Sequence, residues 1–366
     1  MVGKYWFLLC SIILGCLSCS TDKQVNTSPQ QPNILFILTD AHAYHAIGAY
    51  GERLANLNPT PHLDALAKDG MLFRNVFCNN SICTPSRASI LTGQYPQTNG
   101  VLDLDGALPA ATAAFDYNKV LPVQGKYFDP IFITKELGDR REVIDFHGGI
   151  QREVNISNSK GHSSDVITDL TLDWLESRPK KDQPFFLMHH YKAPHDDFEY
   201  APRYEDYLAD AQIPEPASLW YNANNGSIGT RGVNDALTDT IGSSIGHRNI
   251  IRNMGMHMKI DPNIPDPEYK KLAYQEYLKR YLRCVKGVDD NVKRVFDYLE
   301  AEGLDENTVV IYTGDQGFML GEHDYIDKRW MYEESMRMPF LVRYPKLIKA
   351  GSRTDAIINN TDFAPT

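Results

Sequence analysis

The segment NILFILT, residues Asn33–Thr39, is a nearly continuous apolar run that ends at Asp40. A run of this length and composition is typical of a strand buried on both faces of a parallel sheet. Two further apolar runs, Pro184–Tyr191 and Thr308–Thr313, are each followed by a polar cluster, KAPH and GDQG respectively. Because open α/β sheets bind ligands beyond the carboxyl ends of their strands, these clusters predict a functional site at one sheet edge.

Helix signals lie between these strands. Pro61 suits the first position of a helix and Gly70 suits the residue after its end. Further helices are expected over 165–176 and over much of 267–302, where the longer one is expected to break near Gly287. The alternation predicts an α/β fold with a mostly parallel central sheet flanked by helices.

The N-terminal residues have the character of an export signal, with Lys4 followed by an apolar stretch and small residues. The letters ILGC, ending at Cys16, resemble the lipobox of bacterial lipoproteins, and Cys19 is a second candidate. We therefore expect a lipoprotein-type signal peptide over 1–19 and a tether over 20–31. The protein would then be exported and held by a lipid anchor in the periplasm or at the outer membrane or cell surface. A plain cleaved signal or an uncleaved anchor is the alternative.

The composition excludes some classes of partner and framework. The chain has 366 residues, 42% of them hydrophobic and 23% charged, as in an ordinary globular protein. The formal net charge of −10 argues against a nucleic-acid partner. Beyond the signal, Cys78, Cys83 and Cys284 are an odd number without a repeating spacing, so no disulfide framework is implied.

One of these cysteines stands in an unusual setting, the segment SICTPSRASILTG at Ser81–Gly93. A buried thiol packs as a small hydrophobic group and needs no cation nearby, so the nearby Pro85 and Arg87 indicate chemistry. The letters CTPSR, followed by LTG, match the pattern C-x-P-S-R-x-x-x-L-T-G. The chain thereby resembles the type I sulfatases of the alkaline-phosphatase-like superfamily.

The resemblance implies a chemical role for Cys83. In that family the cysteine is oxidised to formylglycine by a formylglycine-forming enzyme or a radical maturase. One hydroxyl of the aldehyde hydrate attacks the sulfur of a sulfate ester and displaces the alcohol, and proton loss from the other hydroxyl then expels sulfate. Arg87 and the N-terminus of the helix would favour the sulfate anion.

A metal site is expected at the strand ends. Asp40 and the pair Asp315 and Gln316 offer hard oxygen donors, which suit Ca²⁺ or Mg²⁺. The resemblance implies calcium, with the modified Cys83 as a further ligand. Sulfatases usually carry a second aspartate where this chain has Ala41, so metal binding is expected to be weakened.

Two later segments extend the resemblance. YKAPHDDFEYAPRY places His195 where the family protonates the leaving alcohol, with Lys192 facing the ligand. GEHDYIDKRWMYEESMRMPFLVRYP places Lys328 on the family's sulfate-binding lysine. Arg329 and His323 are the further substrate-binding candidates.

The resemblance covers residues 32–366, which we expect to be the catalytic domain, but two parts depart from it. Near 109–115 the chain lacks a segment that ends in G-K-W-H-L-G in the family and supplies a lysine and a histidine. Lys126 and His147 are the candidates to replace them. The chain also stops at 362–366, where relatives continue, so a small C-terminal subdomain is expected to be largely missing.

The resemblance implies a sulfuric ester hydrolase acting on sulfated glycans, and the lipoprotein-like start places it outside the cytoplasmic membrane. Trp220, Tyr221 and Tyr204, in or near a loop-rich insertion at 210–263, are candidates to line a sugar site. One alternative is a catalytically impaired lipoprotein that binds sulfated glycans. Another is a phosphatase or phosphodiesterase of the same superfamily, against which Cys83 counts because such enzymes would want serine or threonine there.

Overall fold

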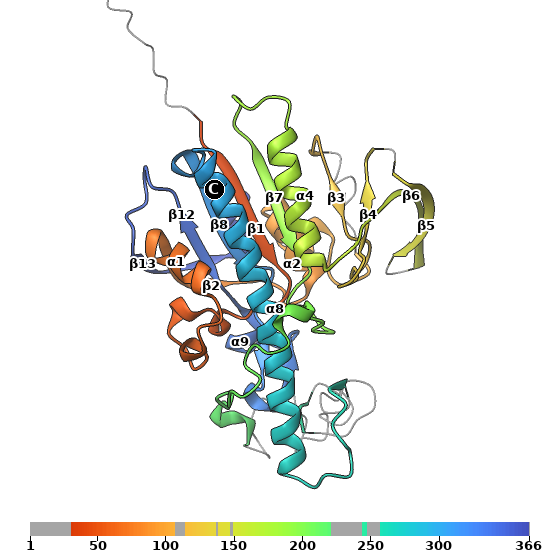
Figure 1. Cartoon of the computed structure of the whole chain (residues 1–366), viewed down its shortest axis with the longest axis vertical. Coiled ribbons are helices and arrows are strands. Elements are labelled where there is room, and N and C mark those ends of the chain that lie inside the picture. The colour runs from red at the N-terminus through yellow and green to blue at the C-terminus, as the bar shows by residue number, and fades with distance from the viewer. Residues whose placement is uncertain are drawn as a thin grey trace, which may run out of the picture. The chain divides into compact units, whose positions relative to one another are not determined.

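The computed structural model describes residues 31–106, 114–136, 138–146, 149–220, 244–246 and 257–365. A seven-stranded sheet runs in the order β11-β2-β12-β8-β1-β7, and β13 pairs with β2; Figure 1 labels all of these strands except β11. Its strands are β1 (Asn33–Thr39), β2 (Met71–Phe77), β7 (Phe186–Tyr191), β8 (Thr308–Gly314), β11 (Arg337–Met338), β12 (Phe340–Arg343) and β13 (Ser352–Asn359).

Strand β1 runs parallel to both of its neighbours, β7 and β8. Thr39 pairs with Tyr191 of β7 and with Gly314 of β8, so the carboxyl ends of the three predicted strands meet at one edge. Strand β12 is antiparallel to β8 and β2. The predicted α/β fold with a central sheet flanked by helices is confirmed, and the sheet is mixed rather than uniformly parallel.

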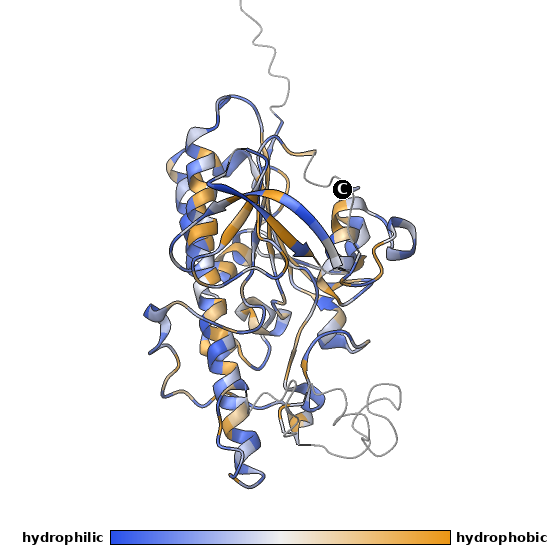
Figure 2. Ribbon diagram, turned by 90° about the vertical axis from the view of Figure 1, so that its right-hand side faces the viewer, coloured by the Kyte–Doolittle hydropathy of each residue, from blue (hydrophilic) through white to orange (hydrophobic). Residues whose placement is uncertain are grey.

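Alternate residues of β1 face two separate cores. Leu35 and Ile37 belong to the core that includes one face of α8, whereas Phe36 and Leu38 pack on the other side with Ile90 of α2. Figure 1 shows α4 and α8 side by side across the strands, and Figure 2 shows apolar residues concentrated in the central strands. The helices are α1 (Pro61–Asp69), α2 (Cys83–Thr92), α3 (Pro96–Asn99), α4 (Ser163–Ser177), α8 (Glu268–Ala301) and α9 (Glu333–Met336).

Helix α8 continues through Gly287, so the predicted break there is wrong. Gly287 is buried, and a Cβ atom at this position would lie 3.2 Å from the ring of Tyr204. The Tyr204 hydroxyl donates a hydrogen bond to Asp290, at 2.9 Å, on the same helix. The glycine therefore allows close packing of an aromatic ring on an intact helix.

Short strands form two further sheets that the sequence did not predict. An antiparallel sheet in the order β3-β4-β6-β5 is made by β3 (Lys119–Val120), β4 (Ile131–Thr134), β5 (Arg140–Phe146) and β6 (Ile150–Asn158). A hairpin joins β9 (Met319–Leu320) to β10 (Ile326–Asp327) through the short 3₁₀ helix η10 (Glu322–Asp324). The other 3₁₀ helices are Tyr44–Ala46, Gly48–Tyr50, Ala55–Leu57, Pro202–Tyr204, Ala217–Leu219, Asp305–Asn307 and Asn360–Asp362.

Some predictions fall on residues outside the described ranges. These are the signal over 1–19 with Cys16 and Cys19, the tether apart from Gln31, the gap segment up to residue 113, His147 and Tyr221. In the part of the chain that is described, no helix combines the length and apolar character needed to cross a bilayer.

Candidate active site

Two carboxylates meet where strands β1 and β8 end, and one arginine of α2 bridges them. Asp40 follows β1 and Asp315 follows β8. Arg87 places Nη2 3.0 Å from Oδ2 of Asp40, and its Nε donates to Oδ2 of Asp315 at 2.8 Å. The backbone N–H of Ala41 donates to the other oxygen of Asp315, at 3.0 Å. The sequence prediction that these strand-end acids converge is confirmed.

The environments of the two carboxylates shift their pKa values in opposite directions. Burial raises the pKa of Asp315, and the neighbouring charge of Asp40 raises it further. Burial also acts to raise the pKa of Asp40, but His195, Arg87 and Lys328 outweigh it and hold that pKa well below its usual range. Asp40 is therefore an anion surrounded by cations, while burial and Asp40 disfavour the charged form of Asp315 and Arg87 favours it.

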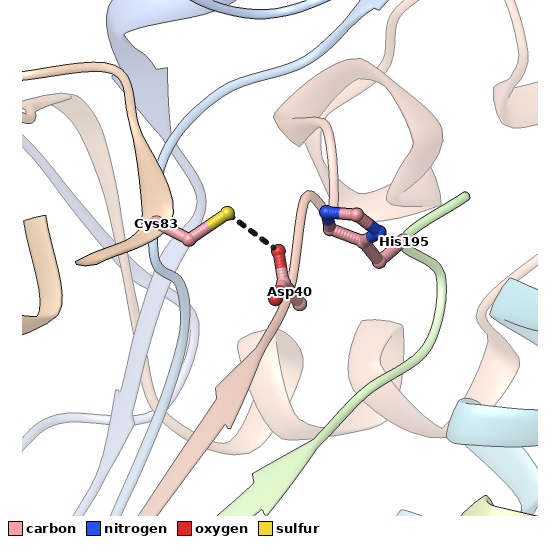
Figure 3. Close-up of side chains that lie close together, drawn as sticks. All are labelled: Asp40, Cys83 and His195. Carbon is pink, nitrogen blue, oxygen red and sulfur yellow. Dashed lines mark hydrogen bonds between the residues drawn. The ribbon is translucent and has the colours of Figure 1, made fainter. Parts of the chain in front are cut away.

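Cys83 is the first residue of α2 and is buried. Its Sγ lies 3.3 Å from Oδ1 of Asp40, the contact drawn in Figure 3, and 3.8 Å from Nε2 of Gln316. The helix begins here because Ile82 is extended, and it ends at Gly93, which adopts the left-handed conformation (φ 65°). Residue 83 therefore sits at a helix N-terminus, where free N–H groups favour an anion.

His195 enters the site from the loop after β7. Figure 3 places its ring beside Asp40 and Cys83, and ligand atoms of these three side chains all lie within 4.8 Å of one another. Nδ1 of His195 contacts a carboxylate oxygen of Asp196. Burial and Lys328 disfavour the imidazolium, but Asp40, Asp196 and Cys83 outweigh them and raise the pKa of His195 to about 10. A histidine held protonated in this way can donate a proton.

Two buried lysines flank the same group of side chains. Nζ of Lys328 lies 3.9 Å from Asp40 and 3.8 Å from Asp327, and only 3% of its side chain is exposed. Nζ of Lys192 donates to the backbone oxygen of Asp196 at 3.3 Å and lies over the ring of Tyr127. Burial lowers the pKa of Lys192, whereas the nearby anions raise that of Lys328 above its usual range despite burial.

Cys83, His195 and Lys328 open onto a cavity of about 200 Å³, which Lys192 does not line. The lining residues are Ile82, Cys83, Leu104, Gln124, His195, Asp196, Lys328 and Arg329. Sequence reasoning had not assigned roles to Leu104, Gln124 or Asp196. The acid directly follows His195 in the quoted segment and could have been noticed there, whereas the other two lie in loops without a local signal.

Several other candidates lie elsewhere. His323 does not line this cavity but stacks on Tyr332, with ring centroids 4.6 Å apart. Trp220 and Tyr204 do not line the cavity either. The indole N–H of Trp220 donates to Glu215, and the hydroxyl of Tyr204 donates to Asp290. Lys126, proposed as a replacement for a missing lysine, is exposed and does not line the cavity.

With this geometry in place, comparison with known proteins identifies the family. A family model described as sulfatase matches residues 32–366. The chain therefore belongs to the sulfatases, a class of enzymes, as its sequence motifs predicted. A solved structure of the protein BT4656 with its substrate D-glucosamine-2-N,6-O-disulfate has a TM-score of 0.75 and 31% identity, covering 92% of this chain and 76% of that one.

Curated relatives agree with this family assignment. An N-acetylglucosamine-6-O-sulfatase of Bacteroides thetaiotaomicron is 32% identical over 412 residues, covering 96% of this chain and 70% of the relative. An ulvan-active sulfatase of Formosa agariphila is 27% identical over 383 residues, covering 97% of this chain. This chain spans 64% of the length of that second relative.

The bridge made by Arg87 generates a stability prediction. Replacement by glutamine should lower the free energy of unfolding by about 3 kcal/mol in EDTA at neutral pH, because it removes the cation that two buried carboxylates share. The loss should shrink at mildly acidic pH, because the raised pKa of Asp315 favours its neutral form, which no longer repels Asp40. Urea unfolding at both pH values measures this.

The matched control is Arg74→Gln, which breaks an ion pair with Asp355 whose side chains are 48% and 66% exposed. Its effect should stay below about 1 kcal/mol. Equal losses for the two variants would contradict a special role for the Arg87 bridge.

Proposed function

We propose that this chain is a sulfuric ester hydrolase that removes sulfate from a sulfated glycan, with residue 83 as the nucleophile after conversion to formylglycine. The observation that carries the proposal is the convergence of Cys83, His195 and Lys328 on one cavity around the Asp40 carboxylate. These are a nucleophile precursor, a proton donor and an anion-binding cation. Together they match what the hydrolysis of a sulfate ester requires.

The charged residues divide the work on the substrate. The formylglycine hydrate supplies an oxygen nucleophile for sulfur and a second hydroxyl from which sulfate is released. Lys328, which is 3% exposed, presents a compact cation to a sulfate oxygen. His195, kept protonated by its neighbours, donates a proton to the departing sugar oxygen, which would otherwise leave as an unstable alkoxide.

A divalent cation fits the donors at the strand ends. Asp40 and Asp315 supply carboxylate oxygens, and Oε1 of the fully buried Gln316 has no hydrogen-bond partner among the described residues. A buried amide oxygen without a hydrogen-bond partner suits calcium, with Mg²⁺ as the alternative ion. The ion would polarise the sulfate and the nucleophile. Ala41 supplies no ligand atom from its side chain, so we propose that binding is weak.

The substrate proposal rests on the relatives. Their names specify the 6-O-sulfate of N-acetylglucosamine and a glucosamine 2-N,6-O-disulfate, so we propose a 6-O-sulfated glucosamine unit. Arg329, which lines the cavity, would contact the sugar beside the reacting group. The proposed partners are a formylglycine-forming or radical maturase and, through a lipid anchor, a membrane. Export and anchoring rest on the N-terminal sequence alone.

The second candidate function is binding of a sulfated glycan without turnover. The observation that favours it is Ala41, which leaves the metal site one carboxylate short of the usual sulfatase pattern. Such a protein would keep the cations and lose the reaction. Turnover therefore discriminates between the two candidates.

The test is co-expression with a maturase, mass spectrometry of the peptide that contains Cys83, and assay on 6-O-sulfated N-acetylglucosamine. We expect conversion of the thiol to the aldehyde and release of sulfate. Cys83→Ala should reduce turnover by at least about a thousandfold, because the nucleophile is lost. Sulfate release that persists in Cys83→Ala would contradict the assignment, and a converted but inactive parent that still binds the sugar would favour the second candidate.

A further prediction concerns the metal. Ala41 is buried and left-handed (φ 64°), a conformation that Asp and Asn tolerate better than Ala. Ala41→Asp adds a third carboxylate beside Asp40 and Asp315, so it should lower the melting temperature in EDTA. Adding calcium should raise the melting temperature of Ala41→Asp at least about twice as much as that of the parent, because a ligand that binds only the native state stabilises it.

Ala41→Asn is the matched control, since it gives the same backbone tolerance without the charge. Its calcium response should stay below that of Ala41→Asp, because an amide oxygen can coordinate calcium but adds no charge. A calcium response that is absent from the parent and from Ala41→Asp alike would rule out Asp40, Asp315 and Gln316 as the ligands.

A further inference from the structure

Lys328 reaches the site from a short hairpin whose tip lies outside the cavity. Strands β9 and β10 pair through Leu320 with Ile326 and through Met319 with Asp327, and Lys328 follows directly. The tip between the strands is η10, the segment Glu322–Asp324. With only two residues in each strand, the hairpin has few ladder bonds of its own, so it depends on contacts with other elements. Tyr277 donates its hydroxyl to the backbone oxygen of Met319, and the N–H of Arg329 donates to Ser81.

The backbone around this hairpin adopts an uncommon conformation. His323, Asp324, Asp327 and Arg329 all have positive φ angles, between 57° and 90°, although none is glycine. Non-glycine residues stay in this region only where the surrounding structure holds them there. The residues on both sides of Lys328 therefore depend on contacts made elsewhere.

The first such contact comes from the loop after β1. Nη2 of Arg53 lies 2.5 Å from Oε1 of Glu322 and donates to the backbone oxygen of Leu320 at 2.8 Å. The second oxygen of Glu322 accepts the backbone N–H of Leu320, at 2.6 Å. Only 9% of the Glu322 side chain is exposed, so solvent screens this pair weakly. One side of the hairpin tip is thus attached to the segment that follows the strand of Asp40.

The second contact comes from helix α8. Nζ of Lys270 lies 3.0 Å from Oδ1 of Asp324, and both side chains are less than 10% exposed. Ser244 donates its hydroxyl to the other oxygen of Asp324 at 2.8 Å, and the Gly246 N–H also points at this carboxylate. The stem of Lys270 lies under Gly246, and its ammonium lies over the ring of Trp220. The other side of the tip is thus attached to the longest helix.

We propose that the ion pairs Arg53–Glu322 and Lys270–Asp324 form a two-sided clamp on the hairpin tip that positions Lys328 against Asp40. Arg53 and Lys270 are then positioning residues that line no part of the cavity. This inference rests on the proposed function where it concerns sulfate, but the placement of Lys328 can be measured without any turnover.

The first measurement is the rate at which an amine-reactive reagent labels each lysine of the folded full-length chain, followed by mass spectrometry. Lys328 is almost fully buried between two carboxylates, so it should label slowly in the parent. Lys270→Met should raise the labelling rate of Lys328 at least about fivefold, because the hairpin opens locally more often. Lys270→Arg, which keeps the charge, should restore protection.

Two controls separate a local effect from general loosening. Lys192 is a second buried lysine of the site, on the loop after β7, and its labelling should stay at the parent rate in Lys270→Met. Lys279→Met removes another lysine of α8, whose Nζ bonds only to the backbone oxygen of Ala209 among the described residues. It should leave the labelling of Lys328 unchanged. Unchanged labelling of Lys328 in Lys270→Met, or an equal rise at Lys192, would overturn the clamp.

The second measurement is a double-mutant cycle on kcat/KM with 6-O-sulfated N-acetylglucosamine. Lys270→Met should lower kcat/KM about tenfold in the parent but less than about twofold in a Lys328→Ala background, because its effect passes through Lys328. Equal losses in both backgrounds would overturn the inference. If the chain shows no turnover at all, the proposed function fails, and the labelling result still decides whether the clamp exists.

Discussion

The bridge from Arg87 to Asp40 and Asp315 is the constraint on which the site depends. Two buried carboxylates at the ends of adjacent parallel strands repel each other. The guanidinium of Arg87 stabilises both, because its Nη2 contacts Asp40 and its Nε contacts Asp315. Because Arg87 lies one turn into α2, satisfying the carboxylates also fixes the start of that helix. Residue 83 is thereby placed beside Asp40, where a nucleophile is needed.

The outline of this arrangement could be predicted from local patterns. The apolar run of β1 and the proline and glycine that bound α1 are signals read within a few residues, and the structure has both elements. The convergence of Asp40 with Asp315 followed from a general rule about parallel strands, since carboxyl ends of neighbouring strands share an edge. The motif at Cys83 then supplied the chemistry that the fold alone leaves open.

The rest depended on contacts between residues distant in sequence. Gly287, taken alone, indicated a break in the helix. The helix is unbroken, and the glycine makes room for the ring of Tyr204, which lies 83 positions earlier in the sequence. Trp220 resembled a sugar platform but instead covers the ammonium of Lys270. His323 lies at the hairpin tip, outside the cavity, because Glu322 and Asp324 on either side of it pair with cations from other elements. No local pattern specifies such partners.

In the proposed mechanism a nucleophile at residue 83 attacks sulfur and leaves the C–O bond of the sugar intact. Hydrolysis of a 6-O-sulfated N-acetylglucosamine in water enriched in oxygen-18 tests this mechanism, with both products analysed by mass spectrometry. The released sulfate should carry the heavy oxygen and the sugar hydroxyl should carry none, because the S–O bond breaks. Heavy oxygen in the sugar hydroxyl would mean that the C–O bond breaks, and would overturn the mechanism.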